Sequence, residues 1–399
     1  MKNKRMQRMF ICLCLAVCLM TVSAAPAYAD NGRAIQAGTS AVSDGDAVYY
    51  GNAGTQWRVL DADATNTGAA GMFLLMENPT GNVVFEAAWN SDDGDGQTNP
   101  NDWQKSDAQA WCTGYAAANF SGIELGAMPY VSKTDAEATL YGIPWGSSSL
   151  NGERMFFLSA QEAATYLGDY DRAPGLQSSG WWWLRSPYAF HDGAAGLVRG
   201  DGHVINDLVD SSPSARPAFN VNLNSVLFTS AAAGGKSSGA GGAGKIFEIP
   251  ASSTTGWKLT LLDSSRGFSA QCTGRSGDTL SISYSGAATG SNEYISAIVS
   301  DGSGYTHYGQ LAASNGSGTV RLDLNGVDMS GKKLYIFSEQ VNGDKMTDYA
   351  SAMVQVEIPS NNPYGVPSTG SHRDTGLMVT LALVSGSVLL LSLRRRKEA

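Results

Sequence analysis

The aromatic and charged side chains best suited to ligand recognition are concentrated in residues 181–219. Three consecutive tryptophans, Trp181, Trp182 and Trp183, are followed closely by Arg185. Because side chains alternate along a strand, Trp181 and Trp183 share one side with Arg185, and Trp182 takes the other. A covered tryptophan buries roughly 150 to 250 Å², so this strand is expected at the centre of a sheet. One side of it should belong to the core, and the other could stack on a ligand.

The segments after this strand add polar groups that a ligand could contact. Two short runs, 197–199 and 203–205, flank Gly200-Asp201-Gly202, and this pattern predicts a β-hairpin with glycines at its turn. We expect ligand contacts from one face of the strand, from the next loop and from the hairpin, namely Trp181, Trp183, His191, Asp192, Arg199, Asp201 and His203. Arg199-Gly200-Asp201 also spells the RGD tripeptide that integrins bind, although a hairpin by itself favours an Asp-Gly turn.

Other residues of this region are expected to hold the fold together, because a guanidinium can satisfy several hydrogen-bond acceptors at a strand end. The residues predicted to be structural are Trp182, Arg185 and Arg216. The separation of His191 and His203 matches no standard metal-binding spacing, and Cys112 has no recognisable base beside it in the sequence. The sequence therefore predicts no catalytic residue, no metal site and no cofactor.

The N-terminus reads as a secretory signal peptide over residues 1–29, with basic residues, an apolar run and a small-x-small cleavage site in order. The residues at the predicted cleavage site are Ala27, Ala29 and Asp30. A lipoprotein signal ending at Cys18 is the alternative, but Val17 stands where a small residue is expected. The formal net charge of −9 argues against nucleic acid as a partner.

The C-terminal residues 361–399 carry the pentapeptide VPSTG, then an uncharged apolar run over 376–393, then a basic cluster. As a helix the apolar run would be about 27 Å long, which just spans the hydrocarbon core of a bilayer. Basic residues after such a run stay on the cytoplasmic side. The sequence therefore predicts a transmembrane helix over 376–393.

This order of features resembles the cell-wall sorting signal of Gram-positive surface proteins, whose pentapeptide is LPxTG. The residues that carry the resemblance are Val366, Pro367, Ser368, Thr369 and Gly370, with valine in place of the usual leucine. The resemblance implies that a sortase cleaves between Thr369 and Gly370 and joins the threonine to a cell-wall peptide. Contact with the membrane through the C-terminal helix would then be transient. A plain single-pass anchor is the alternative.

Between the two ends, composition divides the chain into two expected domains. A Gly/Ser-rich tract over 229–245 has almost no apolar bulk and predicts a flexible linker. Residues 30–228 before it contain short apolar runs, and Ser159 with Glu162 forms a capping-box pattern that predicts a helix. Residues 246–360 after it alternate in short segments separated by turns, which is typical of an immunoglobulin-like β-sandwich.

The first of these domains contains, in order, the motifs W-x-V-L, W-x-x-S-D-x-x-x-W, M-F-F-L-S-x-x-E, W-W-L-R-S-P and R-P-A-F. With them it resembles a family of bacterial surface domains, and more loosely the C-type-lectin-like proteins that include the formylglycine-generating-enzyme superfamily. The resemblance implies an α+β C-type-lectin-like fold with a ligand-binding face. The calcium motifs E-P-N and Q-P-D of carbohydrate-binding lectins are absent.

Together these features predict an exported protein anchored to the cell wall of a Gram-positive bacterium. Its first domain would be a non-catalytic adhesion or ligand-binding module on a β-sandwich stalk, with a glycan or a host or cell-surface protein as ligand. Two alternatives stay open: a structural surface component without a specific ligand, and an exported enzyme related to the formylglycine-generating-enzyme superfamily.

Overall fold

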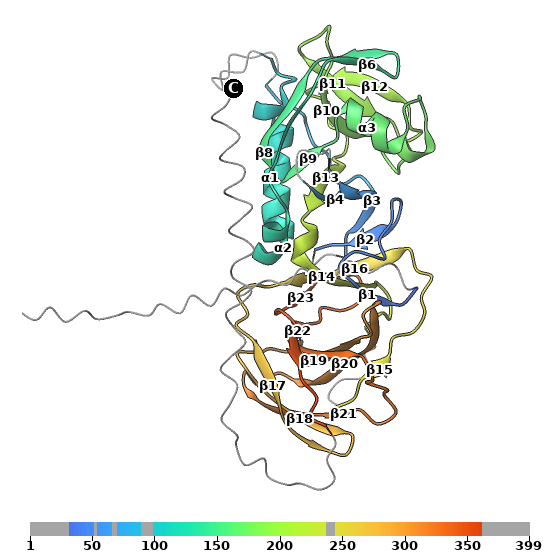
Figure 1. Ribbon diagram of the computed structural model, residues 1–399. Coiled ribbons are helices and arrows are strands. Elements are labelled where there is room, and N and C mark those ends of the chain that lie inside the picture. The colour runs from blue at the N-terminus through green and yellow to red at the C-terminus, as the bar shows by residue number, and fades with distance from the viewer. Residues whose placement is uncertain (1–31, 52–53, 66–69, 89–98, 237–243, 361–399) are drawn as a thin grey trace, which may run out of the picture. The chain divides into compact units, whose positions relative to one another are not determined.

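The computed structural model describes residues 32–51, 54–65, 70–88, 99–236 and 244–360 (Figure 1). Strands dominate these residues, and the helices are few and short. The α-helices are α1 (Asp107–Asn119), α2 (Gly122–Ala127) and α3 (Ala160–Leu167), and the 3-10 turns are η1 (Trp103–Lys105), η2 (Pro174–Leu176) and η3 (Leu223–Ser225).

One large mixed sheet runs through both halves of the chain. Its strands from the first half, in spatial order, are β2 (Ala47–Tyr49), β3 (Gln56–Ala64), β4 (Gly71–Met76), β13 (Pro217–Val221) and β9 (Met155–Phe157). From β2 the sheet continues into the second half through β16 (Gly256–Leu262), β23 (Asp348–Ala350), β22 (Lys333–Gln340), β19 (Glu293–Ser300), β20 (Tyr305–Ala313) and β15 (Phe247–Glu248). Off this path lie β1 (Ile35–Ala37), β14 (Val226–Ala231) and β24 (Val354–Val356).

The remaining strands form small antiparallel sheets. In the first half they are β5 (Val131–Asp135) with β8 (Ser148–Glu153), β6 (Ala138–Leu140) with β7 (Ile143–Trp145), and β10 (Trp182–Pro187) with β11 (Ala194–Val198) and β12 (Val204–Leu208). In the second half they are β17 (Ser269–Ser276), β18 (Thr279–Ser285) and β21 (Gly318–Asp323). Leu280 and Ile282 of β18 share a buried core with Ile295 of β19, so this small sheet packs on the large one.

The expected fold class is wrong. The sequence led us to predict an α+β C-type-lectin-like domain, a separate immunoglobulin-like sandwich and a C-terminal transmembrane helix, whereas the described chain is mostly β and a mixed sheet joins its halves. Strand β16 makes the junction, because it pairs parallel with β2 at one end and parallel with β23 at the other. Strand β16 lies about 90 residues from β23 and about 210 residues from β2 in the sequence. The hydrophobic pattern of a strand does not predict which strands pair with it.

The start of the expected linker is built into this sheet. Strand β14 pairs with β1 on one side and with β16 on the other, and Thr229 and Ser230 are fully buried. A segment of small residues has the composition of a flexible linker, but such residues also fit in a strand between two close neighbours. Phe228 and Ile35 belong to a core that also contains Tyr305 and Phe337 of the second half.

Several predicted features lie outside the described residues. They are the cleavage site at Ala27, Ala29 and Asp30, the pentapeptide Val366, Pro367, Ser368, Thr369 and Gly370, and the span 376–393. Within the described ranges, no helix has the length and apolar character needed to cross a membrane.

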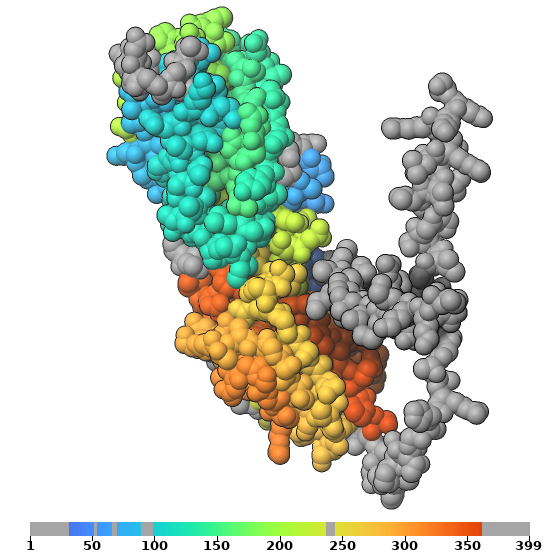
Figure 2. Space-filling model, turned by 90° about the vertical axis from the view of Figure 1, so that its left-hand side faces the viewer, coloured from blue at the N-terminus to red at the C-terminus, as the bar shows by residue number. Residues whose placement is uncertain are grey.

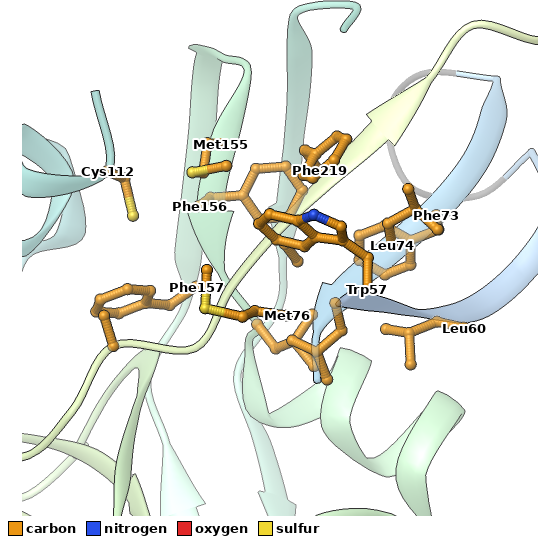
Figure 3. Packing of buried hydrophobic residues seen from close by; sticks show 14 of the residues in the cluster. Trp57, Leu60, Phe73, Leu74, Met76, Cys112, Met155, Phe156, Phe157 and Phe219 are labelled. Atoms are coloured by element: carbon orange, nitrogen blue, oxygen red, sulfur yellow. The ribbon is translucent and has the colours of Figure 1, made fainter. Parts of the chain in front are cut away.

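The largest core lies mostly in the first half, includes Trp257 and Tyr349 of the second, and is rich in aromatic rings (Figure 3). Trp57 and Phe219 meet edge to face with their centroids 4.6 Å apart, and Phe73 stacks on Phe156 at 6.1 Å. Helix α1 packs its Trp111 near Phe157 at 6.4 Å, and α1 with the β5–β8 hairpin forms the teal surface in Figure 2. Strands β10, β11 and β12 pack against this core (Figure 1).

Candidate ligand-binding site

The three tryptophans at the start of β10 differ sharply in exposure. Trp182 and Trp183 are fully buried, whereas Trp181 is 48% exposed and lies just ahead of the strand. The Trp183 Nε1–H donates to the carbonyl of Val83 at 2.7 Å, and the Trp182 ring lies under the guanidinium of Arg216 at 4.9 Å. Both faces of β10 are therefore core. Of the two tryptophans predicted to contact a ligand, only Trp181 can be reached from solvent.

Trp181 lines an open hollow of about 400 Å³. The other residues of its lining are short and mostly polar: Asn82, Asp207, Ser211, Ser212, Pro213 and Ser214. Asparagine and serine can both donate and accept hydrogen bonds, and a carboxylate accepts them. The hollow thus combines one large aromatic surface with several groups able to hydrogen-bond a hydroxylated ligand.

Backbone hydrogen bonds hold the walls of this hollow in place. The amide of Ser214 donates to the carbonyl of Trp181 at 2.9 Å, and the amide of Trp183 donates to the carbonyl of Ser214 at 3.3 Å. Nearby, the amide of Val83 donates to the carbonyl of Pro213 at 2.8 Å. These bonds tie the segments around residues 82, 181 and 213 to one another, so the site needs little ordering before a ligand binds.

Arg199 supports the exposed tryptophan. Its guanidinium carbon lies 5.0 Å from the centroid of the Trp181 ring, within the range of a cation–π contact. Arg199 stands at the end of the β11–β12 hairpin, whose predicted turn is confirmed by the bond from the Gly202 amide to the Arg199 carbonyl at 2.8 Å. The contact covers part of one ring face and fixes the orientation of the ring.

The other polar residues of the hairpin contact the loop before β10. His203 Nδ1 lies 2.6 Å from the Asp171 carboxylate, and Arg172 Nε lies 3.4 Å from that of Asp201. The amide of His203 donates to Asp201 at 3.1 Å and lowers the pKa of that carboxyl. Since Arg199 is stacked on Trp181 and Asp201 is paired with Arg172 of the loop before β10, the geometry gives no support to an RGD-type contact.

His191 and Asp192 lie on an exposed loop and do not line the Trp181 hollow. The buried side chain of Asn101 orders this loop by donating to the carbonyls of Tyr188, His191 and Ala194 at 3.4, 3.2 and 2.9 Å. Phe190 on the same loop is 77% exposed. The predicted site residues therefore fall into separate groups. Of them only Trp181 lines the hollow, and Arg199 contacts its ring.

Arg185 is fully buried in an ionic cluster. It donates to the carboxylates of Glu162 and Asp135 and to the carbonyl of Phe157 at 2.7 Å, and Lys133 contacts both carboxylates at 2.8 and 3.0 Å. Burial alone would raise the pKa of Glu162, but the two cations lower it. Glu162 also completes the predicted capping box with Ser159 at the start of α3, which is confirmed.

Arg216 is also fully buried and donates to the carbonyls of Met76 at 2.9 Å and Glu77 at 3.2 Å. Burial lowers its pKa to about 10, and Arg58 adds to this effect. Its two carbonyl partners lie at the end of β4, and its guanidinium lies over the ring of Trp182. Both arginines are therefore bound within the fold and do not line the hollow.

Among the described residues, neither a metal-binding cluster nor a reactive thiolate at Cys112 is favoured. No group of three or more histidine, cysteine, aspartate or glutamate side chains among them is placed to hold a metal ion. Cys112 is buried, and burial raises the pKa of its thiol well above the ordinary value, which disfavours the reactive thiolate.

Sequence reasoning missed most of the hollow, because its lining comes from three separate stretches. The polar run 210–214 ahead of Ala215 and Arg216 was a usable signal, since it returns the chain to β10. Asn82 carried no signal of its own.

Comparison with known proteins places the hollow inside one family match. Residues 71–223 match the family model described as a domain of unknown function, DUF6273. No curated protein and no solved structure matches the chain. The matched region contains every residue that lines the hollow, so the Trp181 site lies wholly within the part of the chain that is similar to the DUF6273 domain.

Proposed function

We propose that the protein is a non-catalytic surface protein whose Trp181 hollow binds a carbohydrate. One observation carries the proposal: a half-exposed tryptophan, held by Arg199, lines a hollow whose other side chains are almost all short and polar. The C–H face of a sugar ring packs on an aromatic surface, and its hydroxyl groups need neighbouring donors and acceptors. An apolar peptide anchor would leave the serine and aspartate groups of this lining without partners.

A glycan array with residues 30–360 tests this function. Changing Trp181 to Ala should weaken binding by about 2 kcal/mol, or roughly 30-fold in Kd, because exposed aromatic anchors dominate such sites. Phe190→Ala is the matched control, since Phe190 is more exposed than Trp181 but does not line the hollow. Binding that survives Trp181→Ala, or that is lost with Phe190→Ala alone, would place the site elsewhere.

We also propose that the protein is exported and joined to the cell wall. Support comes from the signal-peptide pattern of residues 1–29 and from the sorting-signal resemblance of the pentapeptide Val366 to Gly370. Thr369 supplies the carbonyl that a sortase would attack, so Thr369→Ala should shift the protein from the wall fraction to the membrane fraction. Ser368→Ala serves as the control, because the family pattern leaves this position open. Unchanged wall attachment of the Thr369 variant would contradict the proposal.

A further inference from the structure

A buried lysine and two buried carboxylates meet where β14 and β23 flank β16. Lys236 follows β14 after a tight turn at Gly234 and Gly235. A Cβ on Gly235 would lie 2.4 Å from the carbonyl oxygen of Ala231, so only glycine lets the chain fold back this closely. The turn directs the Lys236 side chain into the sheet, where it is 1% exposed.

The amine of Lys236 lies within bonding reach of both acids. Its Nζ is 2.7 Å from Glu339 Oε2 and 2.7 Å from Asp348 Oδ2, and both carboxylates are fully buried. Thr260 Oγ1 accepts a hydrogen bond from the same Nζ at 3.0 Å. The ring of Phe228, centred 4.7 Å from Nζ, closes the site against solvent. Burying ions in this way costs free energy that the ion pairs only partly return.

The carboxyl group of Asp348 is held between two lysine amines and a backbone amide. Its Oδ2 atom forms ion pairs with Lys236 Nζ at 2.7 Å and with Lys258 Nζ at 2.8 Å. The other oxygen, Oδ1, accepts from the amide of Asn342 at 2.8 Å and holds the carboxyl group in place. The amine of Lys236 therefore lies at close range to a carboxyl group that is held in a fixed position.

We propose that Lys236 and Asp348 condense into an intramolecular amide, with Glu339 as the proton carrier. Lys236 Nζ attacks Cγ of Asp348, a C–N bond forms, and one carboxyl oxygen of Asp348 leaves as water. An ammonium and a carboxylate thus become one amide and one water molecule. The balance needs no oxidant, metal or other reactant.

Glu339 is placed for the proton transfers. Burial alone would lower the pKa of Lys236, but Asp348 and Glu339 raise it, so a proton must leave the amine before attack. Glu339 Oε2, at 2.7 Å, can accept that proton and return it to the departing oxygen. The Tyr308 hydroxyl donates to the other oxygen, Oε1, and keeps the carboxylate oriented.

Lys258 is the rival nucleophile, because its Nζ also approaches Asp348. It donates instead to the carbonyl of Gly343 at 2.7 Å, and no ion pair joins it to Glu339 among the described residues. The geometry therefore assigns the reaction to Lys236. The product would join the turn that follows β14 to strand β23.

Mass spectrometry of the denatured full chain tests the proposal. We expect proteolysis of the wild type to yield a branched peptide that joins Lys236 to Asp348, lighter by one water than the two separate peptides. The variant Glu339→Gln should yield the separate peptides. Its intact mass should therefore exceed that of the wild type by one water, beyond the change of side chain. The variant Lys258→Ala should keep the branched peptide.

The peptides of the wild type are decisive by themselves, because that experiment does not require any variant to fold. Separate Lys236 and Asp348 peptides from the folded wild type would overturn the proposal, as would a branch at Lys258. A branched peptide that still forms in the Glu339→Gln variant would contradict the role of Glu339 as proton carrier. Lys236→Ala should also melt at a lower temperature than the wild type, because a covalent link restricts the unfolded chain.

Discussion

Trp181 and Trp183 are identical side chains two positions apart, yet one faces solvent and the other lies in the core. The difference arises because β10 begins at Trp182, so Trp181 precedes the strand. Trp183 has its indole N–H satisfied by Val83, and its ring meets Phe85 edge to face at 5.5 Å. Alternation along a strand predicts which side chains share a side, but it does not predict where the strand starts.

We expect Trp183→Ala to lower the free energy of unfolding by about 3 to 5 kcal/mol, because it leaves a large cavity in the core. Trp181→Ala is the matched comparison and should change it by less than about 1 kcal/mol. Urea unfolding of residues 30–360 followed by tryptophan fluorescence measures both. A similar loss in the free energy of unfolding for the two variants would show that the Trp181 ring also stabilises the fold.

For the helices and strands, features that depend on neighbouring residues follow from the sequence, whereas contacts between distant segments do not. The capping box of α3 and the turn of the β11–β12 hairpin depend on residues within a few positions of one another, and both were predicted. The acids that pair with Arg185 come from β5 and from α3, 50 and 23 residues away. No periodicity of the sequence indicates that these segments meet, and the same holds for the lining of the Trp181 hollow.

Glu162→Gln should lower the free energy of unfolding at pH 7 by about 3 to 5 kcal/mol, because it leaves Arg185 buried with one charge partner fewer. The folded-state pKa of Glu162 is lowered, so its stabilisation is present above its unfolded pKa of about 4.3 and is lost as the pH falls through the folded value. The difference in stability between wild type and variant should therefore shrink as the pH falls below about 4.3, and it should vanish only below the folded pKa.

Chemical unfolding between pH 3 and pH 7 measures this effect. Glu137→Gln is the control, since Glu137 is exposed near the same cluster and no ion pair is recorded for it among the described residues. A constant difference between wild type and the Glu162 variant over this range would contradict the assigned role.

For the whole molecule, the shared sheet makes the two halves depend on each other. Strand β16 provides partners for β14, β2 and β23, and the core around Phe228 combines residues from both halves. Composition suggested a boundary at 229–245, because small residues resemble a linker when their neighbours in the sheet are unknown.

We therefore expect residues 30–360 to unfold in one cooperative transition. Calorimetry should give a single peak with matching calorimetric and van't Hoff enthalpies. The fragment 30–228, which lacks β16, should be less stable than the same residues within the longer chain. Two separate peaks, or a fragment of unchanged stability, would show that the halves are independent.

The pairing of β4 with β13 also bears on how such a chain can evolve. These strands begin and end the DUF6273-like region, and Met72 lies opposite Val221 in the sheet. Gly71 approaches the backbone of Val221 so closely that a Cβ would lie 2.4 Å from its carbonyl oxygen. A region whose two ends are neighbours can be exchanged for a variant of itself while the flanking strands keep their path. Recombination could thus replace the Trp181 hollow as one unit, provided that glycine stays at the junction.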